Sequence, residues 1–218
     1  MKSKEMPEQV RAILFDYDGV LADTMADNCR AWKKAFRDFG AAITDGEYYA
    51  LEGMSPIAIA NFLGKQKGLS QDSIVHISEN KARYYRESNS FRLYPGVPEA
   101  VKKLKEWGIK LALVSGAARH RIEEMTPREF LSQFDVVVSA DDSVAPKPSA
   151  EPYIKALKLL RIKAENAVVV ENAPLGIEAA IKAGIYCIAL TTTLSKSELT
   201  SADICMDKIT DVVDLMHE

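Results

Sequence analysis

The chain has 218 residues, 47% of them hydrophobic, so it can bury a sizeable core as one domain or as a domain with an insertion. Its 28 basic and 31 acidic residues give a net charge of −3, which argues against a nucleic-acid binder with a basic stripe. No apolar run approaches the roughly 20 residues of a membrane span, and the first ten residues lack the apolar segment of a signal peptide. The three cysteines show no close spacing, which predicts reduced thiols in a cytoplasmic protein.

An apolar run at residues 12–15 leads directly into an acidic loop, DYDGVLADT, at residues 16–24. The run predicts a buried strand, and strand side chains alternate, so Asp16 and Asp18 should start on the same side. Two carboxylates this close repel each other unless a cation or a proton lies between them, and Mg²⁺ prefers such oxygen ligands. One aspartate could then act as a nucleophile and the other as a general acid and base.

Helices alone are predicted between residues 25 and 91. Apolar residues at helical spacing predict helices over residues 25–39, 45–51, 56–63 and 71–88. Because this block interrupts an alternating pattern, we expect residues 25–91 to form an inserted helical cap. Residues 1–24 and 92–218 would then form the α/β core.

Strands and helices alternate from residue 94 onward. Strands are expected over residues 109–114, 136–138, 167–170, 186–190 and 204–205, with helices over 98–107, around Arg121, over 150–160 and 174–184, and at the end of the chain. All-apolar strands in such units predict a parallel sheet covered on both faces, whose ligands bind beyond the carboxyl ends of the strands. Polar residues that end three strands should therefore meet at one edge: Asp16, Ser115, and Glu171 with Asn172.

Four segments in order resemble the motifs of the haloacid dehalogenase superfamily. They are the acidic loop, Ser115 with Gly116 after an apolar strand, Lys147 in APKP at residues 145–148, and ENAPLGIEAA at residues 171–180. The likeness covers nearly the whole chain and is greatest to the branch that contains beta-phosphoglucomutase and small-molecule phosphatases. It implies a Rossmann-like parallel core with a helical cap.

The resemblance also implies catalytic roles for four residues. Asp16 would be phosphorylated by the substrate, and Asp18 would be the general acid and base. Ser115, with Gly116, would bind the phosphoryl oxygens, although a serine here could instead cap a helix. Lys147 would offset the repulsion between the nucleophile and the phosphoryl group, although a lone lysine is usually solvated.

The Mg²⁺ site implied by the resemblance uses Asp16, the backbone carbonyl of Asp18, Glu171 and Asn172. The family usually carries a second acidic residue where this chain has Asn172. An amide oxygen can bind Mg²⁺ but adds no formal charge, so we expect weaker metal affinity.

Two positions favour a phosphatase over a phosphomutase. Asn28 stands where beta-phosphoglucomutases carry a histidine, and Pro56 stands where they carry an arginine that holds a second phosphate. Asp18 argues against dehalogenases, which lack the second aspartate. On the cap side, Glu52 is the candidate for substrate contact, and a surface glutamate at a helix end is equally consistent with the sequence.

The basic residues of the last cap helix, Lys81, Arg83 and Arg86, could meet a substrate anion, but we expect them to face solvent. The chain is therefore predicted to be a Mg²⁺-dependent phosphatase for a small phosphorylated metabolite, such as a sugar phosphate, phosphoglycolate or pyrophosphate. It would act as a monomer or weak dimer. A phosphomutase remains an alternative, as does a catalytically weakened relative that binds a phosphorylated ligand or a protein partner.

Overall fold

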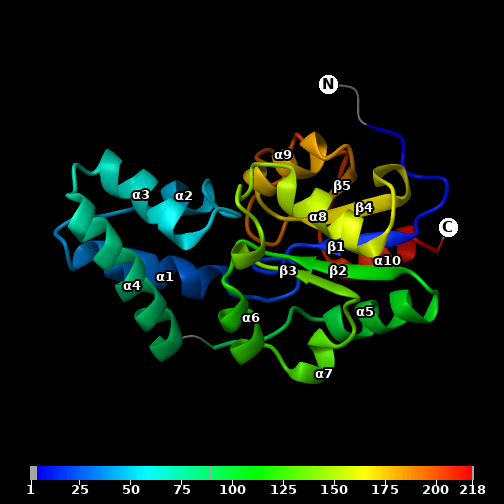
Figure 1. Cartoon of the computed structure of the whole chain (residues 1–218), viewed down its shortest axis with the longest axis horizontal. Coiled ribbons are helices and arrows are strands. Elements are labelled where there is room, and N and C mark those ends of the chain that lie inside the picture. Colours follow the sequence, from blue (N-terminus) through cyan, green and yellow to red (C-terminus); the bar gives the residue numbers. More distant parts are fainter. Residues whose placement is uncertain (1–3, 89, 218) are drawn as a thin grey trace.

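The computed structural model describes residues 4–88 and 90–217. These residues form an α/β unit and a smaller unit of four helices at its side (Figure 1). None of the described helices is long and apolar enough to cross a membrane.

A six-stranded parallel sheet forms the centre of the α/β unit, with the strand order β3-β2-β1-β4-β5-β6. The strands are β1 (Ala12–Phe15), β2 (Lys110–Val114), β3 (Val136–Val138), β4 (Ala167–Glu171), β5 (Tyr186–Leu190) and β6 (Ile204–Met206). Every predicted strand is present, and the α/β fold with its parallel sheet is confirmed.

Both faces of the sheet are covered, which explains why the strands are apolar apart from Lys110 at the start of β2 and Glu171 at the end of β4. In β1, Ile13 and Phe15 belong to one apolar cluster, whereas Ala12 and Leu14 belong to the cluster on the opposite face. The first cluster includes residues from α5 (Val97–Glu106), α6 (Arg119–Met125), α7 (Arg128–Leu131) and α10 (Ile209–Leu215). The second includes residues from α8 (Glu151–Leu160) and α9 (Pro174–Lys182).

The helical unit has an apolar cluster of its own, which includes Trp32, Phe36 and Leu63. It contains α1 (Met25–Arg37), α2 (Asp45–Tyr49), α3 (Pro56–Gln66) and α4 (Gln71–Ser88). The first helix ends two residues before the predicted position. At α2, Thr44 and Glu47 form a capping box, which satisfies the backbone N–H groups at the start of the helix.

The register of the sheet brings the polar strand ends to one edge. Phe15 is paired with Leu113 of β2 and with Val170 of β4, so Asp16 lies level with the ends of both neighbouring strands. Its backbone N–H donates to the carbonyl of Val170 at 2.9 Å. Ser115 directly follows β2 and Glu171 is the last residue of β4, so three strands deliver polar side chains to the same place.

Candidate active site

A cavity of about 230 Å³ lies between the α/β unit and the helical unit. Five of the predicted site residues line it, four from the α/β unit and one from the helical unit: Asp16, Asp18, Ser115, Gly116 and Glu52. Lys147, Glu171 and Asn172 lie directly behind Asp16 and its loop, as the following contacts show.

Lys147 is fixed against Asp16 at the end of β1. Its Nζ lies 2.6 Å from Oδ1 of Asp16, 2.7 Å from Oε1 of Glu171 and 3.1 Å from the carbonyl oxygen of Val114. These three acceptors use all three ammonium hydrogens. The side chain is only 1% exposed, so the alternative of a solvated surface lysine is excluded.

Glu171 holds Lys147 and the turn that follows β4. Its Oε1 accepts hydrogen bonds from Lys147 and from the hydroxyl of Tyr153 at 2.8 Å. Its Oε2 accepts from the backbone N–H groups of Asn172 and Ala173 at 2.9 and 3.3 Å. A carboxylate has about four acceptor positions, so Glu171 would have to give up one of these bonds to bind a metal directly.

The single positive charge of Lys147 is shared between two buried carboxylates. Burial raises the pKa of Asp16 well above its ordinary value, and the charge of Lys147 opposes that rise. The pKa of Lys147 is raised by the same two carboxylates, although burial opposes it. Asp16, Glu171 and Lys147 therefore carry a net charge of −1 when all are ionised, which favours a further cation nearby.

Asp18 lies in a different environment from Asp16. Its Oδ1 accepts a hydrogen bond from the Thr24 hydroxyl at 2.5 Å and one from Nδ2 of Asn28 at 3.3 Å, and its Oδ2 forms an ion pair with Arg121. Burial alone would raise the pKa of Asp18, but the charge and hydrogen bond of Arg121, together with Thr24, lower it. Each aspartate therefore has its own cationic side chain.

Ser115 and Gly116 form the part of the cavity wall that follows β2. The Ser115 oxygen accepts a hydrogen bond from the backbone N–H of Ala117 at 3.0 Å, which leaves its own hydrogen available for donation. Ser115 is not a helix cap, because α6 begins at Arg119 and its N-cap residue is Ala118. A Cβ atom on Gly116 would lie 2.7 Å from the carbonyl oxygen of Gly53, so glycine permits this close approach of the two units.

Asn172 fits a cation site through one unused oxygen. Its Nδ2 donates to Thr193 at 3.1 Å, whereas its Oδ1 is buried and has no hydrogen-bond partner in the described part of the chain. A Cβ atom on Gly19 would lie 2.1 Å from Nδ2, which places Asn172 against the aspartate loop. The described residues contain no group of three or more His, Cys, Asp or Glu side chains arranged for a metal. A cation here would therefore depend on Asp16, backbone oxygen and the Asn172 amide.

The helical unit contributes Glu52 to the cavity wall. Glu52 is 9% exposed, and its Oε2 is buried without a hydrogen-bond partner among the described residues. Burial, followed by the charge of Asp18, raises the pKa of Glu52 to about 7. The alternative of an ordinary surface glutamate is therefore excluded.

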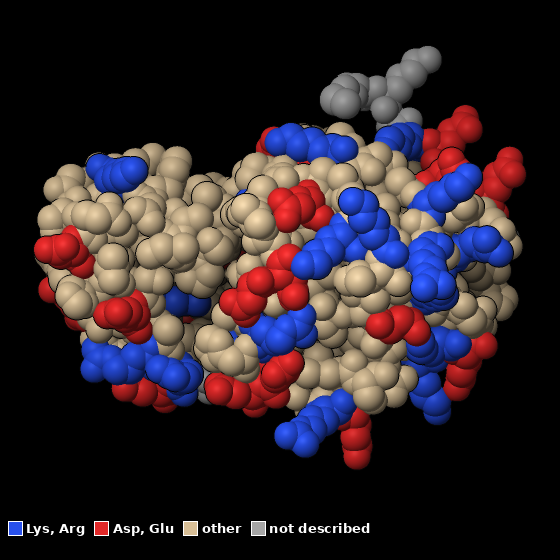
Figure 2. Space-filling view, viewed as in Figure 1, with Lys and Arg blue, Asp and Glu red and all other residues tan. Residues whose placement is uncertain are grey.

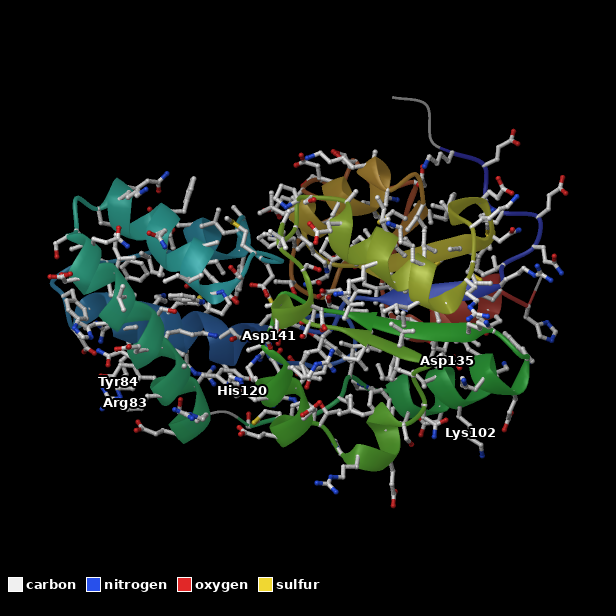
Figure 3. All side chains as sticks on the ribbon, viewed as in Figure 1. Arg83, Tyr84, Lys102, His120, Asp135 and Asp141 are labelled. Carbon is white, nitrogen blue, oxygen red and sulfur yellow. The ribbon has the colours of Figure 1, made fainter. Side chains whose placement is uncertain are left out.

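The prediction that Lys81 faces solvent is wrong. Lys81 is 6% exposed, lines the cavity and donates to Oδ1 of Asn28 at 2.6 Å. The sequence held a signal for this position, because Ile77, Lys81 and Tyr85 follow one another at four-residue intervals on the buried face of α4. Arg83, by contrast, is exposed and lies with Tyr84 on the outer side of the same helix (Figure 3).

Arg121 is the second cavity residue that sequence reasoning missed. The pattern predicted a short helix around Arg121, but an arginine on a seven-residue helix gives no sign of the carboxylate it will meet. It reaches Asp18, which lies 103 positions earlier in the chain.

The chain is similar to proteins of one family over nearly its whole length. The model of the family "Haloacid dehalogenase-like hydrolase" matches residues 13–190. Validoxylamine A 7'-phosphate phosphatase of Streptomyces hygroscopicus subsp. limoneus is 30% identical over 93% of this chain and 95% of the relative. Phosphoglycolate phosphatase of Aquifex aeolicus is 28% identical over 95% of this chain and 97% of the relative.

A solved structure shares the fold of this chain. The beta-phosphoglucomutase of Clostridium difficile superposes with a TM-score of 0.78 at 25% identity, over 94% of this chain and 93% of the other. Together these findings confirm the sequence-based prediction of a phosphatase enzyme. The chain belongs to the haloacid dehalogenase-like hydrolases, the family that its four motifs predicted.

Proposed function

We propose that this enzyme is a Mg²⁺-dependent phosphatase that hydrolyses a small phosphorylated metabolite through an aspartyl-phosphate. One observation carries the proposal: Asp16 and Asp18 line one cavity, yet Lys147 pairs with the first and Arg121 with the second. Two carboxylates with separate partners can take separate roles. The relatives named as phosphatases support the reaction class, and a cavity of about 230 Å³ suits a small substrate.

In the first half of the reaction, an oxygen of Asp16 attacks the phosphorus atom. The bond between phosphorus and the leaving oxygen breaks, and Asp18, which enters this step in its protonated form, gives its proton to that oxygen. The carboxylate that results is the form that Arg121 and Thr24 stabilise. Lys147 keeps Asp16 oriented and offsets negative charge as the two anions approach. The hydroxyl of Ser115 and the backbone N–H of Gly116 donate to the phosphoryl oxygens, which stabilises the charge on the transferring group.

In the second half, water attacks the same phosphorus atom and breaks its bond to Asp16. Asp18, now a carboxylate, takes the proton from that water. Arg121 and Thr24 favour this ionised form of Asp18. Inorganic phosphate leaves, and Asp16 and Asp18 return to their starting states.

Asp16, the backbone carbonyl of Asp18 and the amide oxygen of Asn172 would hold the Mg²⁺ ion. When bound, this ion supplies positive charge that offsets the charge on the phosphoryl oxygens. Glu171 remains a proposed contributor, directly or through water. We also propose that residues 25–91 act as the cap, because Glu52 and the Gly53 carbonyl bring this segment onto the cavity.

Replacing Asp16 with asparagine tests the proposal. Phosphate release from a panel of phosphorylated metabolites, with and without Mg²⁺, should be abolished in Asp16→Asn, since an amide is not a nucleophile here. Asp23→Asn is the matched control, because Asp23 belongs to the same loop but pairs with Arg92 outside the cavity lining. An Asp16→Asn variant that folds and retains wild-type turnover would refute the assignment.

A phosphomutase is the second candidate, and the superposition on a beta-phosphoglucomutase favours it. Asn28 and Pro56 oppose it, because they line the cavity at the two positions where beta-phosphoglucomutases carry a histidine and an arginine. Interconversion of glucose 1- and 6-phosphates in the presence of a bisphosphate primer would support the mutase. Release of free phosphate without interconversion would support the phosphatase.

A further inference from the structure

Two cationic side chains from different units meet on the Asp18 side of the cavity. Arg121 comes from α6 of the α/β unit, and Lys81 comes from α4 of the helical unit. The Arg121 guanidinium lies 5.2 Å and the Lys81 ammonium 5.0 Å from the centre of the same Tyr85 ring. On the outer face in view, by contrast, Lys and Arg side chains lie among Asp and Glu side chains (Figure 2).

Part of the Arg121 guanidinium group has no hydrogen-bond acceptor among the described residues. Its Nη2 pairs with Asp18, but its Nη1 is buried and has no hydrogen-bond partner in residues 4–88 and 90–217. A buried, unpaired donor on a charged group is costly, so such a group is expected to have a partner in the working state. The rings of Tyr17 and Tyr85 lie against the guanidinium at 5.7 and 5.2 Å and leave it fixed in place.

Lys81 lacks a carboxylate partner. Its ammonium donates to Asn28 and lies 5.4 Å from the centre of the Trp32 ring, and no carboxylate of the described residues lies within 4.0 Å of it. Burial and the positive charge of Arg121 lower the pKa of Lys81 to about 7. The other charged groups that line the cavity on this side are Glu52, Arg86, His120 and Glu124. Figure 3 shows His120 on α6, on the side that faces the helical unit.

The position of this pair relative to Asp18 decides what it would bind. Asp18, which protonates the leaving oxygen in the proposed reaction, touches Arg121 directly and Lys81 through Asn28. The leaving group must therefore lie beside both cations, whereas Lys147, Ser115 and Gly116 serve the transferring phosphoryl group. A second anion a few atoms from the leaving oxygen would reach Nη1 of Arg121.

We propose that Arg121 and Lys81 form a binding site for a negatively charged group, a carboxylate or a second phosphate, on the leaving group of the substrate. This inference rests on the phosphatase function proposed above and narrows its substrate class. A neutral leaving group would leave Nη1 of Arg121 without a hydrogen-bond acceptor and would place no negative charge beside Lys81, on which only the more distant carboxylates of Asp18 and Glu52 act. Charge-assisted hydrogen bonds of this kind correspond to a preference of roughly 10- to 100-fold for the charged substrate.

Matched pairs of substrates test the preference. Phosphoglycolate is compared with ethylene glycol monophosphate, in which a hydroxymethyl group replaces the carboxylate. The bisphosphate of propane-1,3-diol is compared with its monophosphate. We expect kcat/KM of the wild-type enzyme to be at least tenfold higher for the charged member of one pair, and the better pair identifies the kind of anion. Equal or higher kcat/KM for both neutral members would overturn the inference.

Variants then assign the preference to the two residues. Arg121→Gln and Lys81→Gln should each reduce the ratio of charged to neutral kcat/KM roughly tenfold, whatever their effect on either substrate alone. Arg119→Gln is the matched control, because Arg119 lies on the same helix and pairs with Asp142 outside the cavity lining. It should leave the ratio unchanged. An unchanged ratio in Arg121→Gln would contradict the assignment.

Binding to Asp16→Asn separates this inference from the proposed reaction. Calorimetry with this variant should give at least tenfold tighter binding of the charged member, and adding Arg121→Gln should remove that difference. If no phosphate ester is turned over by the wild-type enzyme, the phosphatase proposal fails, yet this measurement still decides the anion site. If turnover occurs and binding shows no preference for the anion, only the anion site fails.

Discussion

Replacing Lys147 with methionine isolates the buried charge cluster behind the cavity. Methionine keeps the length and apolar stem of the side chain but removes the ammonium group that contacts Asp16, Glu171 and the Val114 carbonyl. Asp16 and Glu171 would then be two buried carboxylates without their cation. We expect this substitution to lower the free energy of unfolding far more than the loss of a surface ion pair would.

The magnitude follows from the burial of the three side chains. Lys147 and Glu171 are each 1% exposed and Asp16 is 6% exposed, so water screens these charges poorly. Removing one partner of a buried pair costs about 3–5 kcal/mol of unfolding free energy. For a chain of this size that loss corresponds to a fall in Tm of roughly 6–20 °C. Lys105→Met is the control, because Lys105 and Asp135 are about one-third exposed, and the loss there should stay below about 1 kcal/mol.

The stability lost in Lys147→Met should increase as the pH rises. Burial and the charge of Glu171 raise the pKa of Asp16, and Lys147 opposes them, so its removal raises that pKa further. A carboxyl with a raised pKa in the folded state contributes stability below its ordinary pKa, and that contribution is lost as the pH rises. The deficit of Lys147→Met should therefore be smaller at pH 5 than at pH 7.5.

Urea unfolding followed by circular dichroism, in the presence of a chelator, measures this deficit without a bound cation that could replace the lysine charge. Lys147→Met combined with Glu171→Gln should regain part of the lost stability, because one uncompensated charge is removed. A deficit below about 1 kcal/mol at pH 7.5, or one equal at both pH values, would refute the reasoning.

Two further variants test the metal site and Glu52. Asn172→Asp should lower the Mg²⁺ concentration at half-maximal activity roughly tenfold, because the substitution adds a formal negative charge to the oxygen ligands. Calorimetric titration with Mg²⁺ checks this, and an unchanged Mg²⁺ affinity would contradict it. Burial raises the pKa of Glu52 to about 7 from 4.5, so its contribution to stability is present below pH 4.5 and lost as the pH rises through about 7. Between pH 5 and pH 8 the free energy of unfolding of Glu52→Gln should therefore fall by roughly 1–3 kcal/mol less than that of the wild type, as measured by urea unfolding. An equal fall in both proteins would contradict this expectation.

The sheet was predictable because its physical signal is local. The central strands are buried on both faces and so appear in the sequence as short apolar runs, as in Val168, Val169 and Val170 of β4. The polar residue after each run is then fixed at the sheet edge by the parallel register. The four-residue helix α7, at Arg128–Leu131, was not predicted, because so short a segment shows no periodicity.

The cationic side chains of the site also differ in whether a local sequence pattern predicts them. Lys147 could be assigned because it lies in a recognisable motif. Arg121 and Lys81 acquire their surroundings only when α6 and α4 meet across the cavity, and no local pattern encodes that meeting. The available sequence signal for Lys81 was its position on the apolar stripe of α4. That position determines its burial more strongly than the usual preference of lysine for solvent.

The charge count at the sheet edge gives an argument for a metal that does not depend on the family. The acidic loop first suggested that a cation or a proton lies between Asp16 and Asp18. In the folded chain Asp18 is instead balanced by Arg121, whereas Lys147 alone faces both Asp16 and Glu171. The excess of −1 therefore lies on the Asp16 side, where Asn172, whose backbone N–H donates to Glu171, has an unused side-chain oxygen. A divalent cation at that point would favour the ionised form of Asp16 and leave Asp18 to its own partner, so one ion would separate the roles of the two carboxylates.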